Sequence, residues 1–258
     1  MRNIATLCFG VAALAVSSPS SASDWIVTIG GRAQAVVPFE GAGHDIFVPT
    51  PALQIRRVGR PDRPVIADDG LGLSLLSLGP FSAGPVVRLR GKRGSDFDHA
   101  GLSEIPLAIE PGVFANLWAT NWLRLHGEMR RGVRGHAGWI GDAGLDLALR
   151  SGPWTATLGP RVGWGDHSYM DTYFGVTPAE AAANPVLNAA YMPAGGIRYE
   201  GGAATLARRW GKQWQTTANF GFHRLASIPG DSPIIRSFGG RDEFSGGLGL
   251  KYSFTWSR

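Results

Sequence analysis

Apolar and polar residues alternate strictly between Trp154 and Trp164. The even positions of this run, among them Leu158 and Val162, are apolar, and the odd positions are small or polar. Alternation with a period of two predicts a β-strand that has one apolar face. The run is about as long as a tilted strand that crosses a bilayer, and tryptophan suits the two membrane interfaces. It is therefore typical of a transmembrane β-strand.

The same alternation recurs along the chain, most clearly in residues 213–223 and from Leu248 onward. We therefore predict an all-β protein, an antiparallel transmembrane β-barrel of twelve strands, because bacterial barrels have an even number. The pattern is weak over residues 59–80, which leaves ten strands as the alternative. The predicted strands are 25–37, 47–58, 63–67, 71–79, 84–91, 112–120, 123–131, 136–150, 154–165, 196–207, 213–223 and 245–256.

The links between these strands are of two lengths. Short links predict periplasmic turns and long links predict outer loops, as is usual in such barrels. In one long link, Thr177 is a candidate N-cap, followed by Pro178 and by Glu180 three residues after the cap, which predicts one short helix. The short links are 150–153 and 208–212, and the long ones are 92–111, 166–195 and 225–244.

Residues 1–22 have the features of a signal peptide. A basic Arg2 precedes an apolar run, and Ser20-Ser21-Ala22 fits the small-residue cleavage rule. We expect a mature barrel of residues 23–258; the alternative, a buried N-terminal helix, fits poorly with Gly10 and the serines and proline that follow. The only cysteine, Cys8, lies in this segment, so disulfides and thiolate sites are not expected in the mature chain.

A soluble barrel of the lipocalin type is the alternative to a membrane barrel. Its strands also alternate, but their apolar face points inward and their charges meet water. The aromatic strand ends, the strand length and the secretion signal favour a barrel in the outer membrane of a Gram-negative cell, with lipid against its apolar face. Glycine, at 37 of 258 residues, suits tight turns and closely packed walls.

The chain carries 25 basic and 20 acidic residues, and loss of Arg2 with the signal peptide would leave 24 basic residues. These residues are scattered between strands, so nucleic-acid binding is not expected. Basic residues outnumber acidic ones on the polar face of the strands. An open lumen would then favour anions, whereas charges that pair across the interior would close a small barrel. The candidate lumen charges are Arg88, Arg90, Arg124, Glu128, Arg130, Asp146, Arg161, Arg198, Glu200 and Lys251.

Three groups of residues invite a search for catalytic or metal chemistry. His126 and Glu128 share one face of a strand and could form the acid–base pair of an outer-membrane hydrolase. An ion-pair network is the better interpretation, because no serine nucleophile stands nearby in sequence. The groups at 96–99 and 166–171 lack the spacing of known metal sites. We therefore expect no enzymatic activity, no catalytic or metal-binding residues and no cofactor.

The stretch from Asp171 to Thr177 resembles the YFGVT signature of the MipA/OmpV family of outer-membrane proteins. Later runs, at 224–225 and 231–235, and the closing segment 247–254 are also similar to that family, and the resemblance covers the mature chain. One departure is that this chain continues beyond Phe254 to Arg258, which would obscure the terminal aromatic used in barrel assembly. The signature residues are Tyr173, Phe174, Gly175, Val176, Arg224, Leu225, Asp231, Ser232 and Pro233.

The resemblance implies a function as a scaffold. The protein after which the family is named is an MltA-interacting protein that links a lytic transglycosylase to a murein synthase in peptidoglycan enlargement. Other members are outer-membrane antigens and adhesion proteins. The resemblance supplies no residue set for partner binding. The expectation is a monomeric scaffold for peptidoglycan-remodelling proteins; a surface adhesin or antigen and a small anion-preferring channel are the alternatives.

Overall fold

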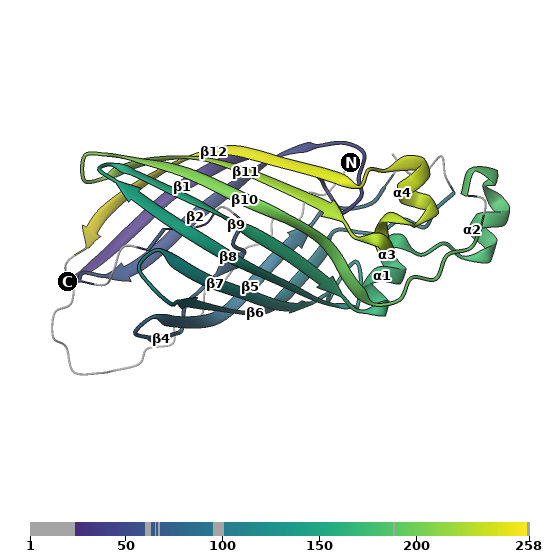
Figure 1. The fold of residues 1–258 in the computed structure, drawn as a ribbon, viewed down its shortest axis with the longest axis horizontal. Helices are drawn as coiled ribbons and strands as arrows, with labels where there is room; N and C mark the ends of the chain where they lie inside the picture. The colour runs from purple at the N-terminus through teal and green to yellow at the C-terminus, as the bar shows by residue number, and fades with distance from the viewer. Residues whose placement is uncertain are drawn as a thin grey trace, which may run out of the picture.

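The backbone forms one curled antiparallel sheet (Figure 1). The computed structural model describes residues 24–59, 63–64, 66, 68–94, 101–187 and 189–256. The order of strands is β2-β1-β12-β11-β10-β9-β8-β7-β6-β5-β3, and β4 also pairs with β5. The bounds are β1 Trp25–Val36, β2 Ile46–Arg57, β3 Leu71–Gly72, β4 Leu76–Leu78, β5 Phe81–Arg90, β6 Ala108–Trp118, β7 Leu123–Arg131, β8 Trp139–Ser151, β9 Trp154–Gly165, β10 Gly196–Trp210, β11 Trp214–Leu225 and β12 Asp242–Trp256.

The predicted fold class and the count of twelve strands are confirmed, but the twelve are not all at the predicted places. The strand expected at 63–67 is wrong: Arg63, Pro64 and Ile66 lie outside any strand. A proline has no backbone N–H for a sheet ladder, which disfavours a strand there. The segment expected at 71–79 is instead divided into β3 and β4.

The sheet has an unpaired seam between β2 and the β3–β4 segment. Arg57, at the end of β2, lies opposite Trp25, at the start of β1, and Leu78, at the end of β4, lies opposite Phe81. Arg57 and Leu78 both lie at the end of the barrel where Trp25 begins β1 and a short turn joins β4 to β5, so β2 and the β3–β4 segment run in the same direction. In the described part of the chain, no backbone pairing joins β2 to β3 or β4.

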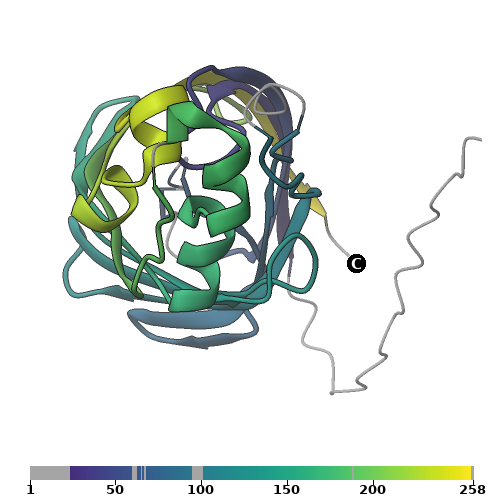
Figure 2. The same ribbon diagram turned by 90° about the vertical axis from the view of Figure 1, so that its right-hand side faces the viewer.

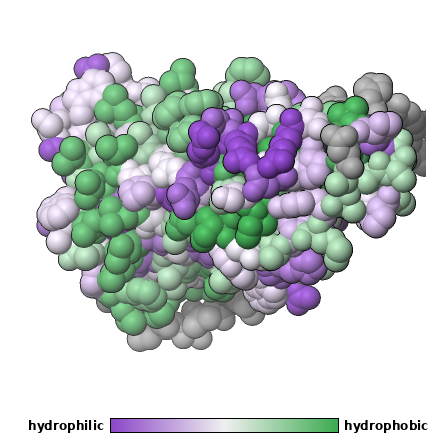
Figure 3. Space-filling view, turned by 45° about the vertical axis from the view of Figure 1, so that its right-hand side comes forward, coloured by the Kyte–Doolittle hydropathy of each residue, from purple (hydrophilic) through white to green (hydrophobic). Residues whose placement is uncertain are grey.

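Many large apolar side chains lie on the outside of the strands, and Figure 3 shows hydrophobic areas of this kind on one face. Charged side chains of the same strands are buried inside the barrel. Leu158 on β9 is 63% exposed, whereas Arg161 on the same strand is 7% exposed. Such a surface is stable only where lipid replaces water around it. Other exposed apolar residues of the wall are Leu53, Ile55, Val113, Leu125, Met129, Leu147, Leu149, Leu206, Phe220 and Leu248.

The two ends of the barrel differ. At the end that we call the turn end, short hairpins join the strands, and Gly79, Gly152 and Gly211 adopt positive φ angles in three of them, which favours glycine. Trp25 and Trp256 pair at this end, so β12 continues past Phe254, as its alternation indicated. The opposite end, the loop end, carries the long connections.

Helices lie across the loop end (Figures 1 and 2). The helix predicted after Thr177 is present with its capping box, but a single helix was too few. One of the helices that the sequence analysis did not predict is α1. Its buried residues Tyr169, Met170, Tyr173 and Phe174 share one helical face. Among the described residues, no helix is both long and apolar enough to span a membrane. The helices are α1 His167–Phe174, α2 Pro178–Ala183, η2 Pro185–Leu187, α3 Ser227–Gly230 and α4 Pro233–Phe238.

Candidate functional site

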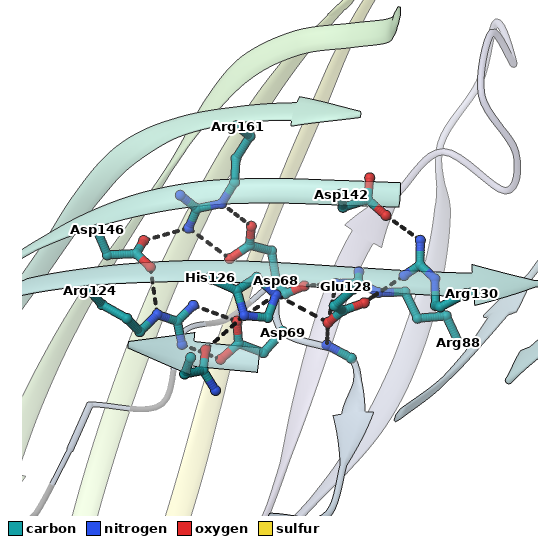
Figure 4. Close-up of polar contacts among 12 residues, drawn as sticks. Asp68, Asp69, Arg88, Arg124, His126, Glu128, Arg130, Asp142, Asp146 and Arg161 are labelled. Carbon is teal, nitrogen blue, oxygen red and sulfur yellow. Dashed lines mark hydrogen bonds and ion pairs between the residues drawn. The ribbon is translucent and has the colours of Figure 1, made fainter. Parts of the chain in front are cut away.

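A chain of ion pairs lines the interior of the barrel (Figure 4). Arg161 on β9 binds Asp146 on β8 (2.6 Å) and also Asp68. Arg124 on β7 donates from Nε to Asp146 (2.8 Å) and holds Asp69 through two bonds of 2.7 Å. We call the ten residues labelled in Figure 4 the central ion-pair network: Asp68, Asp69, Arg88, Arg124, His126, Glu128, Arg130, Asp142, Asp146 and Arg161.

The two aspartates of this network come from the segment between β2 and β3, not from the strands of the wall. Arg32 on β1 interacts electrostatically with both Asp68 and Asp69. The same aspartates pair with Arg161 and Arg124, on β9 and β7. Because β1 is separated from β7 and β9 by several strands of the sheet, Asp68 and Asp69 lie within the lumen, between its sides.

The Glu128 carboxylate has polar partners on several sides. It accepts hydrogen bonds from Arg88 (2.8 Å), from Arg130 (2.6 Å) and from the Gly70 backbone N–H (3.1 Å). Nε2 of His126 lies 3.3 Å from Glu128 Oε1, and its Nδ1 lies 2.8 Å from the Asn116 side-chain oxygen. A carboxylate held by two guanidiniums is a poor general base, since both stabilise its charged form. The pair fits the ion-pair interpretation.

A second group of charges lies nearer the loop end. Arg198 on β10 binds Asp142 (2.6 Å) and Glu40, and Arg90 on β5 lies 3.3 Å from Glu40. Arg90 also donates to Glu110 (2.8 Å). We call Glu40, Arg90, Glu110 and Arg198, together with His136 at 3.2 Å from Glu110, the upper ion-pair network. Asp142 joins it to the central network through Arg130.

The loop residue Glu40 ties this network to the helices. Burial raises the pKa of Glu40, but the guanidiniums of Arg198 and Arg90 lower it by more, so its pKa lies below the ordinary range. Tyr169 of α1 donates its hydroxyl to Glu40 (2.9 Å), and burial raises the pKa of Tyr169 well above its ordinary value. The carboxylate therefore stays charged, and the phenol stays protonated, at neutral pH.

The predicted signature residues meet at the loop end. Ser232 donates its hydroxyl to the Phe174 carbonyl (2.6 Å), and Tyr173, Phe174 and Val176 are buried with Leu225 in one apolar cluster. This cluster and the helices around it form what we call the loop-end cap. The remaining signature residues have different surroundings: Arg224 pairs with Asp242 on the surface, Asp231 pairs with Arg236 and Arg241, and Gly175 and Pro233 end α1 and begin α4.

Nine of the ten candidate lumen charges lie inside the barrel, and Glu200 does not. Glu200 is exposed and lies opposite the outward-facing Val162. A register shift between Ile197 and Tyr199 places both Arg198 and Tyr199 inward, and a bulge of this kind reverses the alternation that follows. The expectation that Glu200 faces the lumen is wrong for that reason. Lys251 is inward and buried, but it lies nearer the turn end than the other charges.

Sequence reasoning also missed charged residues of the two networks. Asp142 shares the phase of Asp146 on β8, so the alternation itself could have identified it. Glu110 lies just before the predicted start of its strand, and the correct start at Ala108 would have included it. Glu40, Asp68 and Asp69 come from connections, where no periodicity signals the direction of a side chain.

The residues discussed as metal ligands have structural partners. Asp166 accepts hydrogen bonds from the Tyr169 and Trp139 backbone N–H groups, so it caps α1, and His167 lies 2.8 Å from the Pro193 carbonyl. In the described part of the chain, no group of three or more metal-binding side chains is present. The group at 96–99 lies outside the described residues.

The family comparison covers nearly all of the described strands. Residues 28–254 match the family described as MltA-interacting protein MipA. The chain belongs to the MipA family. The loop-end cap and the inward charges described above are therefore features of a MipA-family outer-membrane barrel, and the resemblance seen in the signature residues is confirmed. The comparison with curated proteins gave no significant match.

Solved structures similar to this MipA-family chain are outer-membrane proteins. The NanC porin is 10% identical, with 90% of this chain and 99% of that chain covered and a TM-score of 0.41. The COG4313 outer membrane channel from Pseudomonas putida F1 is 10% identical, with 92% and 97% covered and a TM-score of 0.37. The outer membrane protease OmpT from Escherichia coli is 11% identical, with 93% and 99% covered and a TM-score of 0.29.

Proposed function

We propose that this protein is a monomeric, non-enzymatic scaffold in the outer membrane that holds a lytic transglycosylase and a murein synthase together. In outer-membrane barrels, short turns face the periplasm and long loops face outward. The turn end of this chain would then face the peptidoglycan and the enzymes that remodel it. The description of the family as MltA-interacting supports the first partner.

The observation that carries this proposal is the paired lumen. Arg124 and Arg161 each bind two aspartates, one from the wall and one from the inner segment. Of the two alternatives for the lumen charges, pairing across the interior is the one that closes a small barrel, and it supports a scaffold over a channel. A barrel that transports nothing acts through its two ends, and Glu128 and His126, held as they are, offer no nucleophile for catalysis.

A crosslinking experiment in intact envelopes tests the scaffold. Photoreactive residues at Asn121 and Pro153, in two turns at the turn end, should crosslink to a transglycosylase and to a murein synthase. Equivalent residues at Val186 and Met192, which are exposed at the loop end, serve as the matched control. Solubilised complexes from the first set should contain both enzymes. Recovery of neither enzyme from the turn-end set would contradict the proposal.

A surface role as an adhesin or antigen is the second candidate, and an observation at the loop end favours it. The loop-end cap is folded and still exposes Met192 (80%) and Val186 (52%), two apolar side chains that a partner could cover as part of a larger contact. Replacing both with glutamate should abolish adhesion of cells without changing the barrel. Unchanged adhesion in the double variant would count against this candidate.

A further inference from the structure

At the turn end of the barrel, two arginines of the outer wall lie against tryptophan rings. Arg208 on β10 lies directly opposite Trp154 on β9, and Arg57 on β2 lies opposite Trp25 on β1. In each pair, Cζ of the arginine is 5.1 Å from the centroid of the tryptophan ring. Both arginines continue the outward phase of the exposed apolar residues on their strands. They therefore face the lipid side of the wall and not the lumen.

Arg208 has the more complete surroundings of the two. Its Cζ lies only 3.8 Å from the centroid of the Trp210 ring, two residues further along β10. Nε1 of Trp210 donates a hydrogen bond of 2.9 Å to Oγ1 of Thr216, which lies opposite Arg208 on β11. This bond holds the indole ring next to the guanidinium. We call Trp154, Arg208, Trp210 and Thr216 the arginine–tryptophan cluster.

The contacts of Arg208 differ from those of an outward arginine at the loop end. Arg224 on β11 pairs with the carboxylate of Asp242 on β12. Arg208 instead contacts two rings, and its buried Nε has no hydrogen-bond partner among the described residues. A tryptophan face attracts a cation through its quadrupole but carries no net charge. The ring contacts therefore orient the guanidinium and leave its positive charge in place.

The cluster lies at the level where lipid headgroups are expected. Trp154 begins β9 and Trp210 ends β10, and both are exposed. Tryptophan on the outside of a barrel marks the membrane interface. Leu206 and Leu158 come next toward the middle of the wall and are also exposed. Because two residues of a strand span about 7 Å, the wall changes from basic to apolar over the distance that separates the phosphate of a phospholipid from its acyl chains.

We propose that the arginine–tryptophan cluster binds the phosphate group of a membrane phospholipid, whose acyl chains lie against Leu206 and Leu158. Arginine recognises phosphate oxygens through charge-assisted hydrogen bonds. A charge on the lipid face of a barrel is costly, and a bound phosphate offsets that cost. With the turn end toward the periplasm, the lipid belongs to the periplasmic leaflet. The site does not depend on the scaffold function, because it involves only the wall and the bilayer.

Native mass spectrometry of the full mature chain, released from a neutral detergent, tests the proposal. The probe is phosphatidylglycerol. Diacylglycerol with the same acyl chains lacks the phosphate, and glycerol phosphate lacks the acyl chains. Phosphatidylglycerol should bind in a saturable manner and about tenfold or more tightly than either control, since only this lipid offers both parts. Equally tight binding of glycerol phosphate would identify a soluble phosphate ligand and would contradict the proposal.

Variants place the lipid at this cluster. Arg208→Gln should lower the affinity of one site about tenfold or more, because a charge-assisted contact is lost. At a lipid concentration that just saturates the parent, it should carry one phosphatidylglycerol fewer. Trp154→Leu/Trp210→Leu keeps the charge but removes both rings, and it should weaken the same site about threefold or more. Arg224→Gln is the matched control and should bind as the parent does.

Two further points make the comparison decisive. Arg57 and Trp25 are unchanged in all these proteins, so any lipid held there contributes equally to each. A heat-modifiable shift on gels would verify folding, and the tryptophan variant decides the question if Arg208→Gln does not fold. The proposal is overturned if the folded parent binds phosphatidylglycerol no more tightly than diacylglycerol. It is equally overturned if the folded cluster variants bind this lipid as Arg224→Gln does.

Discussion

At the scale of single residues, one hydroxyl joins the two signature segments. Ser232 is fully buried, and it donates to the Phe174 carbonyl while its Oγ accepts from the Ile234 N–H and so caps α4. Both groups would be unsatisfied without it, and buried polar groups left unpaired are costly. This accounts for a serine at a position whose surroundings are otherwise apolar.

Replacing Ser232 with alanine should therefore loosen the loop-end cap. We expect a loss of about 1–3 kcal/mol in the free energy that holds the cap closed, because the carbonyl and the helix N–H lose their partner. Hydrogen exchange of the α1 and α4 amides would measure it. Ser237→Ala, which removes an exposed hydroxyl, is the control and should change exchange little. Equal protection in both variants would contradict the expectation.

Glu40 gives the loop end a defined dependence on pH. Because its pKa is lower in the folded protein, its ion pairs stabilise the fold fully above the unfolded pKa of about 4.3, and this stabilisation is lost as the pH falls through the folded value. Glu40→Gln should destabilise the protein by about 3–5 kcal/mol at pH 7, since Arg198 and Arg90 lose a buried partner.

Urea unfolding in lipid vesicles at a series of pH values would measure this effect. The difference between parent and Glu40→Gln should be largest at neutral pH. It should begin to shrink below the unfolded pKa of about 4.3 and should disappear only as the pH falls through the lower pKa of the folded carboxylate. The comparison isolates Glu40 from the other carboxylates, which titrate in both proteins. A difference that stays constant down to pH 2 would exclude Glu40 as the source.

At the scale of elements, the segment between β2 and β3 is the least expected part of the fold. Its Ile66 is 2% exposed, and its Asp68 and Asp69 are held by Arg161 and Arg124. Two guanidiniums thus anchor inside the lumen a stretch that an ordinary barrel would place in its wall. Because these residues do not form a wall strand next to β2, the sheet has its unpaired seam there.

Neutralising both aspartates should release this segment. In an Ile66→Cys background, Asp68→Asn/Asp69→Asn should make the cysteine react with a maleimide about tenfold faster or more, because the local opening no longer breaks two ion pairs. The only natural cysteine is Cys8, in the predicted signal peptide, so labelling is specific in the mature chain. Asp242→Asn, which removes an exposed ion pair, should leave the rate unchanged. Fast labelling in the parent would show that the segment is not anchored.

At the scale of the whole molecule, three zones follow one another along the barrel. The loop-end cap covers one mouth of the barrel (Figure 2). The central ion-pair network occupies the middle (Figure 4), and a cavity lies at the turn end. Acidic and basic side chains pair with each other in the middle. We therefore expect the lumen to be closed to ions.

Purified protein in planar bilayers should accordingly show no stable single-channel steps. The reason is that Arg124 and Arg161 pair with aspartates of the inner segment, so these charges neutralise each other inside the lumen. A porin measured in the same bilayers is the positive control. Regular conductance steps from the pure parent protein would contradict the closed lumen and would revive the small anion-preferring channel.

The alternation of the sequence predicted the strands and most of the inward charges, and the aromatic strand ends, the strand length and the secretion signal added the apolar outer face. Arg88, Arg124 and Arg161 follow directly from period two, since a strand in a barrel wall has only two sides. The capped helix after Thr177 also followed from local residues alone, because a capping box needs only a four-residue segment.

Only the tertiary structure decided what period two cannot express. The bulge before Tyr199 reversed the phase of Glu200, and the segment carrying Asp68 and Asp69 entered the lumen where a strand was expected. Ser232 met Phe174 across the loop end. Each of these depends on contacts between residues far apart in the chain. Local periodicity indicates on which face of a strand a residue lies, but it does not indicate which residue from elsewhere in the chain it contacts there.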